Sequence, residues 1–244
     1  MSETVVPYGK ESGSKREQVE EMFDNISHKY DFLNHFLSLG IDVVWRKKSL
    51  KKIQNPNPEQ ILDVATGTGD FAIAAKKKYA TCTVKGIDIS NGMLEVGREK
   101  LQKRSIEGIE LIQADSAEIP FESNSFDVAI VAFGVRNFEN LKAGLTEMQR
   151  VLKPGGEIVV LEFSKPKSFP FKQIYNFYFS HILPRFGKMI SKDSAAYTYL
   201  PESVKAFPEG NDFLKVLSES GFRDGKAKPL TFGISSIYHG IKKS

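Results

Sequence analysis

Short apolar runs alternate with segments of helical periodicity through the middle of this 244-residue chain. Each apolar run has the length of a buried strand, and in the segments between the runs apolar residues recur every three or four positions. The predicted strands cover residues 60–65, 83–89, 109–114, 126–133 and 157–163. Strands that alternate with helices in this way predict an α/β fold with a doubly wound, mostly parallel sheet.

The N-terminal part departs from this alternation and is expected to be helical. Ser14 and Glu17 form a capping box, and Asp42 is expected to cap a second helix, so we predict N-terminal helices over residues of about 15–54. The periodicity of the first helix is carried by Val19, Met22, Phe23, Ile26 and Tyr30. That of the second is carried by Trp45, Leu50 and Ile53.

The second half of the chain adds an insertion and a closing pair of strands. The turn at 153–156 is expected to end a helix before the fifth strand, because it contains one proline and two glycines. A helical insertion is predicted after that strand, at about 167–208. A helix at 212–220 and two strands near 226–230 and 233–241 follow it. No linker divides the chain, so we expect a single domain over residues 1–244.

The strongest chemical signal lies at residues 61–70. A strand-like run ends there in a turn that contains Gly67 and Gly69, and a helical run follows at once. Glycines in such a turn let the backbone approach a ligand above the strand ends. Asp88 ends the next strand, where its carboxylate can accept hydrogen bonds from ribose hydroxyls. This pair predicts a site for a nucleotide-type cofactor.

The residues around the turn favour a cationic cofactor. A dinucleotide fingerprint requires a third glycine, but Ala72 stands three positions after Gly69. Asp63 before the turn and Asp70 within it would also repel a pyrophosphate. S-adenosylmethionine carries a sulfonium and an ammonium and suits these carboxylates. An NAD-dependent oxidoreductase is the less favoured alternative.

Composition limits the partners and the compartment. The net charge of +4 is small, and the basic clusters at 46–48, 51–52 and 76–78 are interpreted as solvated helix faces, with attraction to an anionic membrane as the alternative. We expect no nucleic-acid partner. The single cysteine, the absence of a signal peptide and the absence of a long apolar run predict a cytoplasmic protein. The four histidines have no metal-ligand spacing, so no metal is expected.

Several motifs together resemble one methyltransferase family. The alternating strands and helices with a closing strand pair resemble the class I S-adenosylmethionine-dependent methyltransferases, whose Rossmann-like sheet has seven strands with helices on both faces. The narrower resemblance is to the ubiquinone/menaquinone biosynthesis C-methyltransferases. It rests on residues 22–46, LDVATGTGD (62–70), FGVRNF (133–138), LKPGG (152–156), LEFSKP (161–166), AAYTYLPESVKAFP (195–208), GFRD (221–224) and LTFGISSIYHGIKK (230–243).

This resemblance implies roles for further cofactor-binding residues. Ala65 replaces the first glycine of the generic class I motif, a variation that the narrower family shares, and Thr66 after it can offer a hydroxyl near the cofactor. By the same resemblance, Asp115 accepts a hydrogen bond from the adenine amine, and the Ser116 amide donates one to the ring.

The resemblance also implies the reaction. S-adenosylmethionine transfers its methyl group to a ring carbon of demethylmenaquinol, giving menaquinol. The donor leaves as S-adenosylhomocysteine. Methylation of the 2-polyprenyl-6-methoxy-benzoquinol precursor of ubiquinone is the alternative, or the chain performs both. A non-enzymatic cofactor-binding or scaffold module is a further alternative. The N-methylation signature Asp/Asn-Pro-Pro-Tyr is absent after the fourth strand, which counts against nucleic-acid or protein-amide substrates.

A ring carbon becomes nucleophilic when a quinol hydroxyl loses its proton, and the phenol pKa near ~10 makes that step unfavourable at neutral pH. Arg136, in the acceptor position after the fourth strand, is predicted to stabilise the quinolate electrostatically, and Asn137 to orient a ring oxygen. The proton acceptor is left open among water, the Tyr30–Asp31 pair and His239.

Aromatic residues crowd the segment from Phe169 to Ile190. They occupy most of a helix circumference. This predicts that the segment is buried, under the C-terminal part of the chain or in a homodimer interface, or that it lines a channel for the prenyl chain of the substrate. In the second case the segment would contact the membrane, with Lys172, Arg185 and Lys188 near the headgroups.

Overall fold

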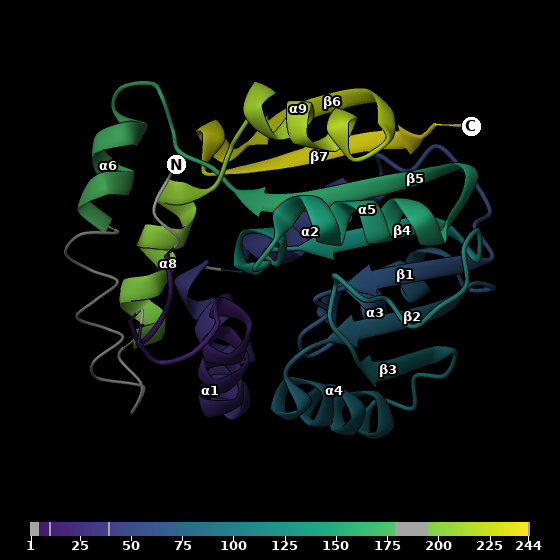
Figure 1. The fold of residues 1–244 in the computed structure, drawn as a ribbon. Coiled ribbons are helices and arrows are strands. Elements are labelled where there is room, and N and C mark those ends of the chain that lie inside the picture. Colours follow the sequence, from purple (N-terminus) through teal and green to yellow (C-terminus); the bar gives the residue numbers. More distant parts are fainter. Residues whose placement is uncertain (1–4, 10, 39, 179–194, 244) are drawn as a thin grey trace.

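The computed structural model describes residues 5–9, 11–38, 40–178 and 195–243. These residues form a seven-stranded sheet with the order β3-β2-β1-β4-β5-β7-β6 (Figure 1). Strands β1 to β5 are parallel, and β7 is antiparallel to both β5 and β6. The strands are β1 (Gln60–Val64), β2 (Thr83–Asp88), β3 (Ile109–Gln113), β4 (Phe126–Ala132), β5 (Leu152–Phe163), β6 (Phe222–Leu230) and β7 (Ser235–Lys242). The predicted mostly parallel sheet is confirmed.

Helices cover both faces of the sheet because neighbouring residues of a strand point to opposite sides. Leu62 and Val64 of β1 belong to a core cluster with α5 (Leu141–Val151) and α9 (Asn211–Glu219). Ile61, directly before Leu62, belongs to a cluster with α2 (Ile41–Leu50) and α3 (Asp70–Lys78). Helix α4 (Asn91–Lys103) packs its Leu94 and Leu101 in a third cluster with β3. Both faces of the sheet are therefore buried, as a parallel sheet requires.

Two sequence predictions need correction. Asp42 does not cap α2, because the helix begins at Ile41 after Gly40 and the Asp42 carboxylate binds Arg46 one turn later. The turn at 153–156 does not precede β5 but lies within it, as a bulge between Leu152, which pairs with Phe126, and Glu157, which pairs with Val128. In both cases a local turn or cap signal is present, but an interaction with another residue decides its role, the Arg46 pair for Asp42 and the pairing with β4 for the turn.

Helix α1 (Lys15–Leu37) lies beyond the carboxyl ends of the parallel strands, as Figure 1 shows in purple. It begins with the predicted capping box, in which Ser14 Oγ accepts from the Glu17 amide at 3.2 Å and Glu17 Oε2 accepts from the Ser14 amide at 2.9 Å. Lys15 Nζ donates to the carbonyls of Arg136 and Phe138 at 3.0 and 2.9 Å. These bonds fix the helix to the loop after β4.

Farther along α1, two carboxylates tie the helix to the loops after β1 and β2. Asp24 accepts a hydrogen bond from Ser90 Oγ at 2.6 Å. Asp31 accepts from Thr68 Oγ1 at 2.5 Å and pairs with Lys100 at 2.5 Å. The helix is therefore fastened across the strand ends at several points along its length.

Two helices follow β5 on the same side of the molecule as α1, namely α6 (Phe171–Phe177) and α8 (Ala195–Ala206). The part of the aromatic segment at 179–190 lies outside the described residues, and with it Arg185 and Lys188. Short 3-10 turns follow β4 (η1, Val135–Asn137) and β6 (η3, Thr231–Gly233). Within the described ranges, no helix combines the length and the apolar character needed to cross a bilayer.

Candidate functional site

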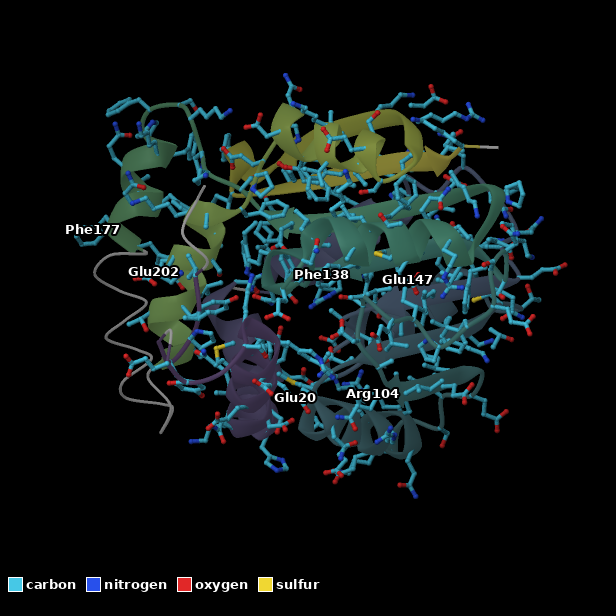
Figure 2. All side chains as sticks on the ribbon, viewed as in Figure 1. Glu20, Arg104, Phe138, Glu147, Phe177 and Glu202 are labelled. Carbon is cyan, nitrogen blue, oxygen red and sulfur yellow. The ribbon has the colours of Figure 1, made fainter. Side chains whose placement is uncertain are left out.

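A cavity opens between α1 and the carboxyl ends of the parallel strands, with about 680 Å³ of empty space including its mouth. Its walls contain six of the nine site residues predicted from sequence: Tyr30, Gly67, Asp88, Asp115, Ser116 and Asn137. Helix α1 supplies Arg16, Val19 and Phe23 on the opposite wall. In Figure 2, Glu20 is labelled on α1 and Phe138, a further lining residue, is labelled after β4.

Asp88 ends β2 at the floor of this cavity and is buried. Its two oxygens accept hydrogen bonds from the amides of Gly67 and Ser90, at 2.8 and 2.9 Å. Burial raises the pKa of Asp88 to about 6. A carboxylate has about four acceptor positions, so these two bonds leave capacity for ribose hydroxyls. Asp88 thus shapes the glycine turn and can also bind a ligand.

Ser90 caps the helix that follows Asp88, since its Oγ accepts from the Met93 amide at 3.1 Å.

The turn after β1 has a strained backbone. Ala65 has a φ of 52° and Gly67 a φ of 56°, in the left-handed region that glycine adopts most easily. A Cβ atom at Gly134, in the loop after β4, would lie 2.5 Å from the Ala65 methyl group. The alanine in the first glycine position is therefore accommodated by a glycine in the neighbouring loop. Gly69 caps α3 and lines neither cavity of the site.

A second, polar cavity of about 340 Å³ adjoins the first and shares Tyr30, Ala65, Gly67 and Ala132 with it. Thr66 lies on its wall and donates its hydroxyl to Asp63 Oδ2 at 2.6 Å. The remaining lining residues are Arg46, Asp63, Thr68, Asp70 and Phe71. Thr66, which was predicted to offer a hydroxyl near the cofactor, therefore lines this cavity and not the first one, and its hydroxyl binds Asp63.

Asp63 and Arg46 stand out in the second cavity because both are buried. Burial is the main cause that raises the pKa of Asp63 to about 7, and the nearby Asp88 adds to it, while the Thr66 bond, the Ala72 amide and Arg46 oppose it. Arg46 was interpreted from sequence as part of a solvated basic face, but its side chain is only 9% exposed. The signal that could have revealed it is Asp42, placed one helical turn earlier to pair with it.

Asp115 and Ser116 lie where β3 ends. Asp115 Oδ1 accepts from the Ala117 amide at 2.8 Å, and Oδ2 forms an ion pair with Arg16 Nε at 2.7 Å. Sequence reasoning missed Arg16, whose pairing with Asp115 depends on the position of α1. Ile89 also lines this end of the cavity.

Arg136 and Asn137 have different surroundings. Arg136 lines neither cavity, and its Nη1 forms an ion pair at 2.7 Å with Glu162 Oε1, a carboxylate that sequence reasoning missed. Asn137 lines the first cavity, and its buried Oδ1 has no hydrogen-bond partner in the described part of the chain. The structure therefore places Asn137 in the wall of the first cavity, whereas Arg136 forms a buried ion pair outside both linings.

The three residues considered as proton acceptors, Tyr30, Asp31 and His239, also differ in their position relative to the cavities. Tyr30 lines both cavities. Asp31 is engaged by Thr68 and Lys100. His239 lies outside both linings, where its Nε2 binds Glu157 at 2.7 Å near the start of β5. Of the three, only Tyr30 reaches the cavities.

Comparisons with known proteins found similar sequences that extend over nearly the whole chain. The model of the ubiE/COQ5 methyltransferase family matches residues 11–242. The demethylmenaquinone methyltransferase of Bacteroides fragilis is 48% identical over 241 residues, which cover 98% of each chain. The ubiquinone/menaquinone biosynthesis C-methyltransferase UbiE of Geotalea daltonii is 46% identical over 230 residues, 93% of this chain and 97% of that one.

Among solved structures, a SAM-dependent methyltransferase of Thermotoga maritima has a TM-score of 0.65 at 17% identity, over 92% of this chain and 99% of that one. This likeness extends over nearly the whole chain and confirms the class I methyltransferase fold predicted from sequence.

Asp88 provides the first test of the site. Asp88→Ala is expected to weaken binding of S-adenosylmethionine by about 1.5–3 kcal/mol, the range for hydrogen bonds to a charged group. Isothermal titration calorimetry on the folded variant measures this. Asp224→Ala removes an exposed carboxylate on β6 and serves as control. An unchanged dissociation constant for Asp88→Ala would mean that the ribose is held elsewhere.

The raised pKa values of Asp63 and Asp88 predict a pH dependence of binding. A cationic donor favours the ionised carboxylates, so affinity for S-adenosylmethionine should rise as the pH increases from about 5.5 to about 7.5, by up to about tenfold per pH unit for each proton released. Asp63→Asn should flatten the upper part of this rise. Calorimetry in two buffers of different ionisation enthalpy counts the protons, and a pH-independent affinity would contradict the prediction.

Proposed function

The chain belongs to the ubiE/COQ5 methyltransferase family, and from this membership we propose that it methylates a ring carbon of demethylmenaquinol, giving menaquinol. S-adenosylmethionine is the donor and leaves as S-adenosylhomocysteine. The observation that carries the proposal is the 48% identity, over 98% of both chains, with a relative named demethylmenaquinone methyltransferase. We further propose that residues 1–244 act as one domain, since α1 supplies one wall of the cavity and the strand ends supply the other.

The described residues fit the donor. S-adenosylmethionine supplies a methyl group on a positively charged sulfur, and the two cavities contain the buried carboxylates Asp63 and Asp88. We propose that Asp88 binds the ribose and that Asp115 and Ser116 bind the adenine. NAD, titrated in parallel, is expected not to bind, because no third glycine follows the turn and the carboxylates would face its pyrophosphate.

The acceptor requires groups that favour the quinolate. Asn137 presents a buried amide oxygen without a partner among the described residues, and we propose that it orients a ring hydroxyl of the quinol. Tyr30 reaches the same cavity and is the side chain that we propose to assist proton removal, with water as the alternative acceptor. Asn137 belongs to the 3-10 turn after β4, and the Tyr30 ring lies beside Gly67 of the turn after β1.

We propose that Arg136 stabilises the quinolate electrostatically. Its Nη1 is used by Glu162, but its buried Nε has no hydrogen-bond partner in the described ranges. Because Glu162 is completely buried, Arg136 also has a structural role: it neutralises the Glu162 carboxylate. The two roles are separable by experiment.

The identity of the ring is tested in cells. Methylation of the 2-polyprenyl-6-methoxy-benzoquinol precursor of ubiquinone is the second candidate, supported by the relative named for both pathways. Mass analysis of the quinones in cells that lack this protein should reveal a naphthoquinone one methyl group short. Accumulation of a demethylated benzoquinone instead would assign the second reaction.

Arg136→Met is expected to leave S-adenosylmethionine affinity nearly unchanged and to lower turnover by about 100-fold, the scale of a lost transition-state charge contact. The double variant Arg136→Met/Glu162→Gln should remain impaired, because the positive charge is still missing. Steady-state kinetics with the quinol acceptor measures both. Arg150→Met, which breaks the ion pair with Glu147 on α5, is the matched control. Recovery of turnover in the double variant would leave Arg136 only its neutralising role.

We also propose that the enzyme works in the cytoplasm at the inner face of the cell membrane, where a prenylated quinol resides. Large apolar side chains are exposed around α6 and η3: Phe169 is 81% exposed, Phe232 63% and Ile174 60%. Phe232 and Phe171 bring the two segments together, since their rings stack with centroids 3.6 Å apart. Phe177, labelled in Figure 2, projects from α6 at the outer edge of the molecule. Exposed Lys167 and Lys172 stand beside these residues and suit anionic headgroups.

Phe169→Asp/Phe232→Asp is expected to reduce cosedimentation with anionic phospholipid vesicles and to lower activity on a long-tailed quinol far more than on a short-tailed one. Val44→Asp changes an exposed apolar residue on α2 and serves as control. Equal losses on the two acceptors would leave only a packing role for this surface. A change in oligomeric state by light scattering would assign the surface to a homodimer.

A further inference from the structure

The 3-10 turn η1 carries Asn137 and is too short to hold its own backbone in place. Its amide hydrogen bonds, of 2.9 and 3.3 Å, end on carbonyls that precede Arg136. The next carbonyls, those of Arg136 and Phe138, accept from Lys15 Nζ at 3.0 and 2.9 Å. The last carbonyls of a helical turn attract a cation. One ammonium group therefore fixes the backbone on both sides of Asn137.

Lys15 holds this ammonium from a rigid base at the start of α1. Its own amide donates to Glu139 Oε1 at 3.1 Å, in the loop that follows η1. The capping box described above fixes the first turn of the helix. Gln18 is buried in the second turn and donates to two carbonyls of the preceding segment, both at 2.9 Å. The helix start and the loop are thus joined by main-chain as well as side-chain bonds.

The position of Lys15 is unfavourable for a cation. Burial and the guanidinium of Arg136 lower the pKa of Lys15 from its ordinary value of 10.5 to about 8, and Glu139 opposes them. The folded state therefore disfavours the charge at neutral pH. Fastening of α1 alone does not require it, since Asp24 and Asp31 already bind the loops after β1 and β2. Perturbed charges of this kind gather at functional sites.

We infer that Lys15 is a positioning residue for methyl transfer, whose ammonium holds Asn137 in place for the acceptor ring through the carbonyls on both sides of it. Lys15 lines neither cavity, so it acts through Asn137 and not on the substrate itself. The next residue, Arg16, pairs with Asp115 at 2.7 Å. Two adjacent residues of α1 thereby tie the acceptor loop and the adenine side of the cavity to one helix start. The inference rests on the function proposed above and on the role of Asn137 within it.

The test compares Lys15→Met with wild type in steady-state kinetics on a short-tailed quinol. At saturating S-adenosylmethionine, kcat should fall by about 10- to 100-fold, the equivalent of a lost hydrogen bond to a charged group. Affinity for S-adenosylhomocysteine should stay within about twofold, and the unfolding temperature should not fall. Lys15→Arg keeps the charge and should recover part of the turnover. Lys142→Met, which removes an exposed lysine from the first turn of α5, is the matched control and should behave as wild type.

A double-mutant cycle shows whether Lys15 acts through Asn137. Asn137→Ala removes the group that Lys15 is inferred to position. In that background, Lys15→Met should lower kcat by less than about threefold. Losses that multiply in the double variant would mean that the two residues act separately, and they would overturn the inference.

Two further results would overturn it. A lower unfolding temperature or weaker S-adenosylhomocysteine binding in Lys15→Met would make Lys15 a structural clamp of α1. Full turnover in Lys15→Met would show that Asn137 needs no such support. A wild-type protein that binds S-adenosylhomocysteine but does not methylate the quinol would instead contradict the proposed function, and the wild-type assay distinguishes this case before any variant is made.

Discussion

The burial of Asp63 and Asp88 at the ends of two adjacent parallel strands is the constraint on which the rest of the site depends. Removing two carboxylates from water is unfavourable, and burial raises the pKa values of both, to about 7 and about 6. The protein compensates in part: Asp88 accepts two amide hydrogen bonds, and Asp63 accepts one from a hydroxyl and is further favoured as a carboxylate by the Ala72 amide and Arg46. The positive charge of a sulfonium donor beside these carboxylates favours their ionised form in the same way.

This constraint also explains the form of the turn after β1. The Gly67 amide reaches Asp88 because the turn takes left-handed backbone conformations, and Thr66 reaches Asp63 from the same turn. Ala65 accepts a strained φ because its methyl group fits against Gly134, which carries no side chain. The turn after β1 and the loop after β4 thus pack closely together. The loop after β4 also carries Asn137, which we propose to orient the acceptor.

Sequence reasoning reached the parts of the site whose signals are local. The strands, the glycine turn and Asp88 follow from patterns within a few residues, and the structure places the latter two around one cavity. Arg16, Arg46 and Glu162 were not found, because each acquires its meaning from a partner or a wall brought close by the fold. Arg46 resembles any lysine or arginine on a helix until α2 packs on the sheet and removes its side chain from water. Glu162 resembles an ordinary strand residue until Arg136 meets it.

The junction of the two cavities determines where the reacting groups can meet. The sulfur of the donor stands between its nucleoside end and its amino acid end. If these ends occupy the first and second cavities, the sulfur lies near the residues that both cavities share, Tyr30, Ala65, Gly67 and Ala132. Three of the four come from the turns and strand ends just described, and Tyr30 comes from α1. Asn137, which we propose to orient the acceptor ring, lines the first of these two cavities. A helix fastened to the loops after β1, β2 and β4 therefore does more than cover the strand ends, because it contributes Tyr30, which lines both cavities.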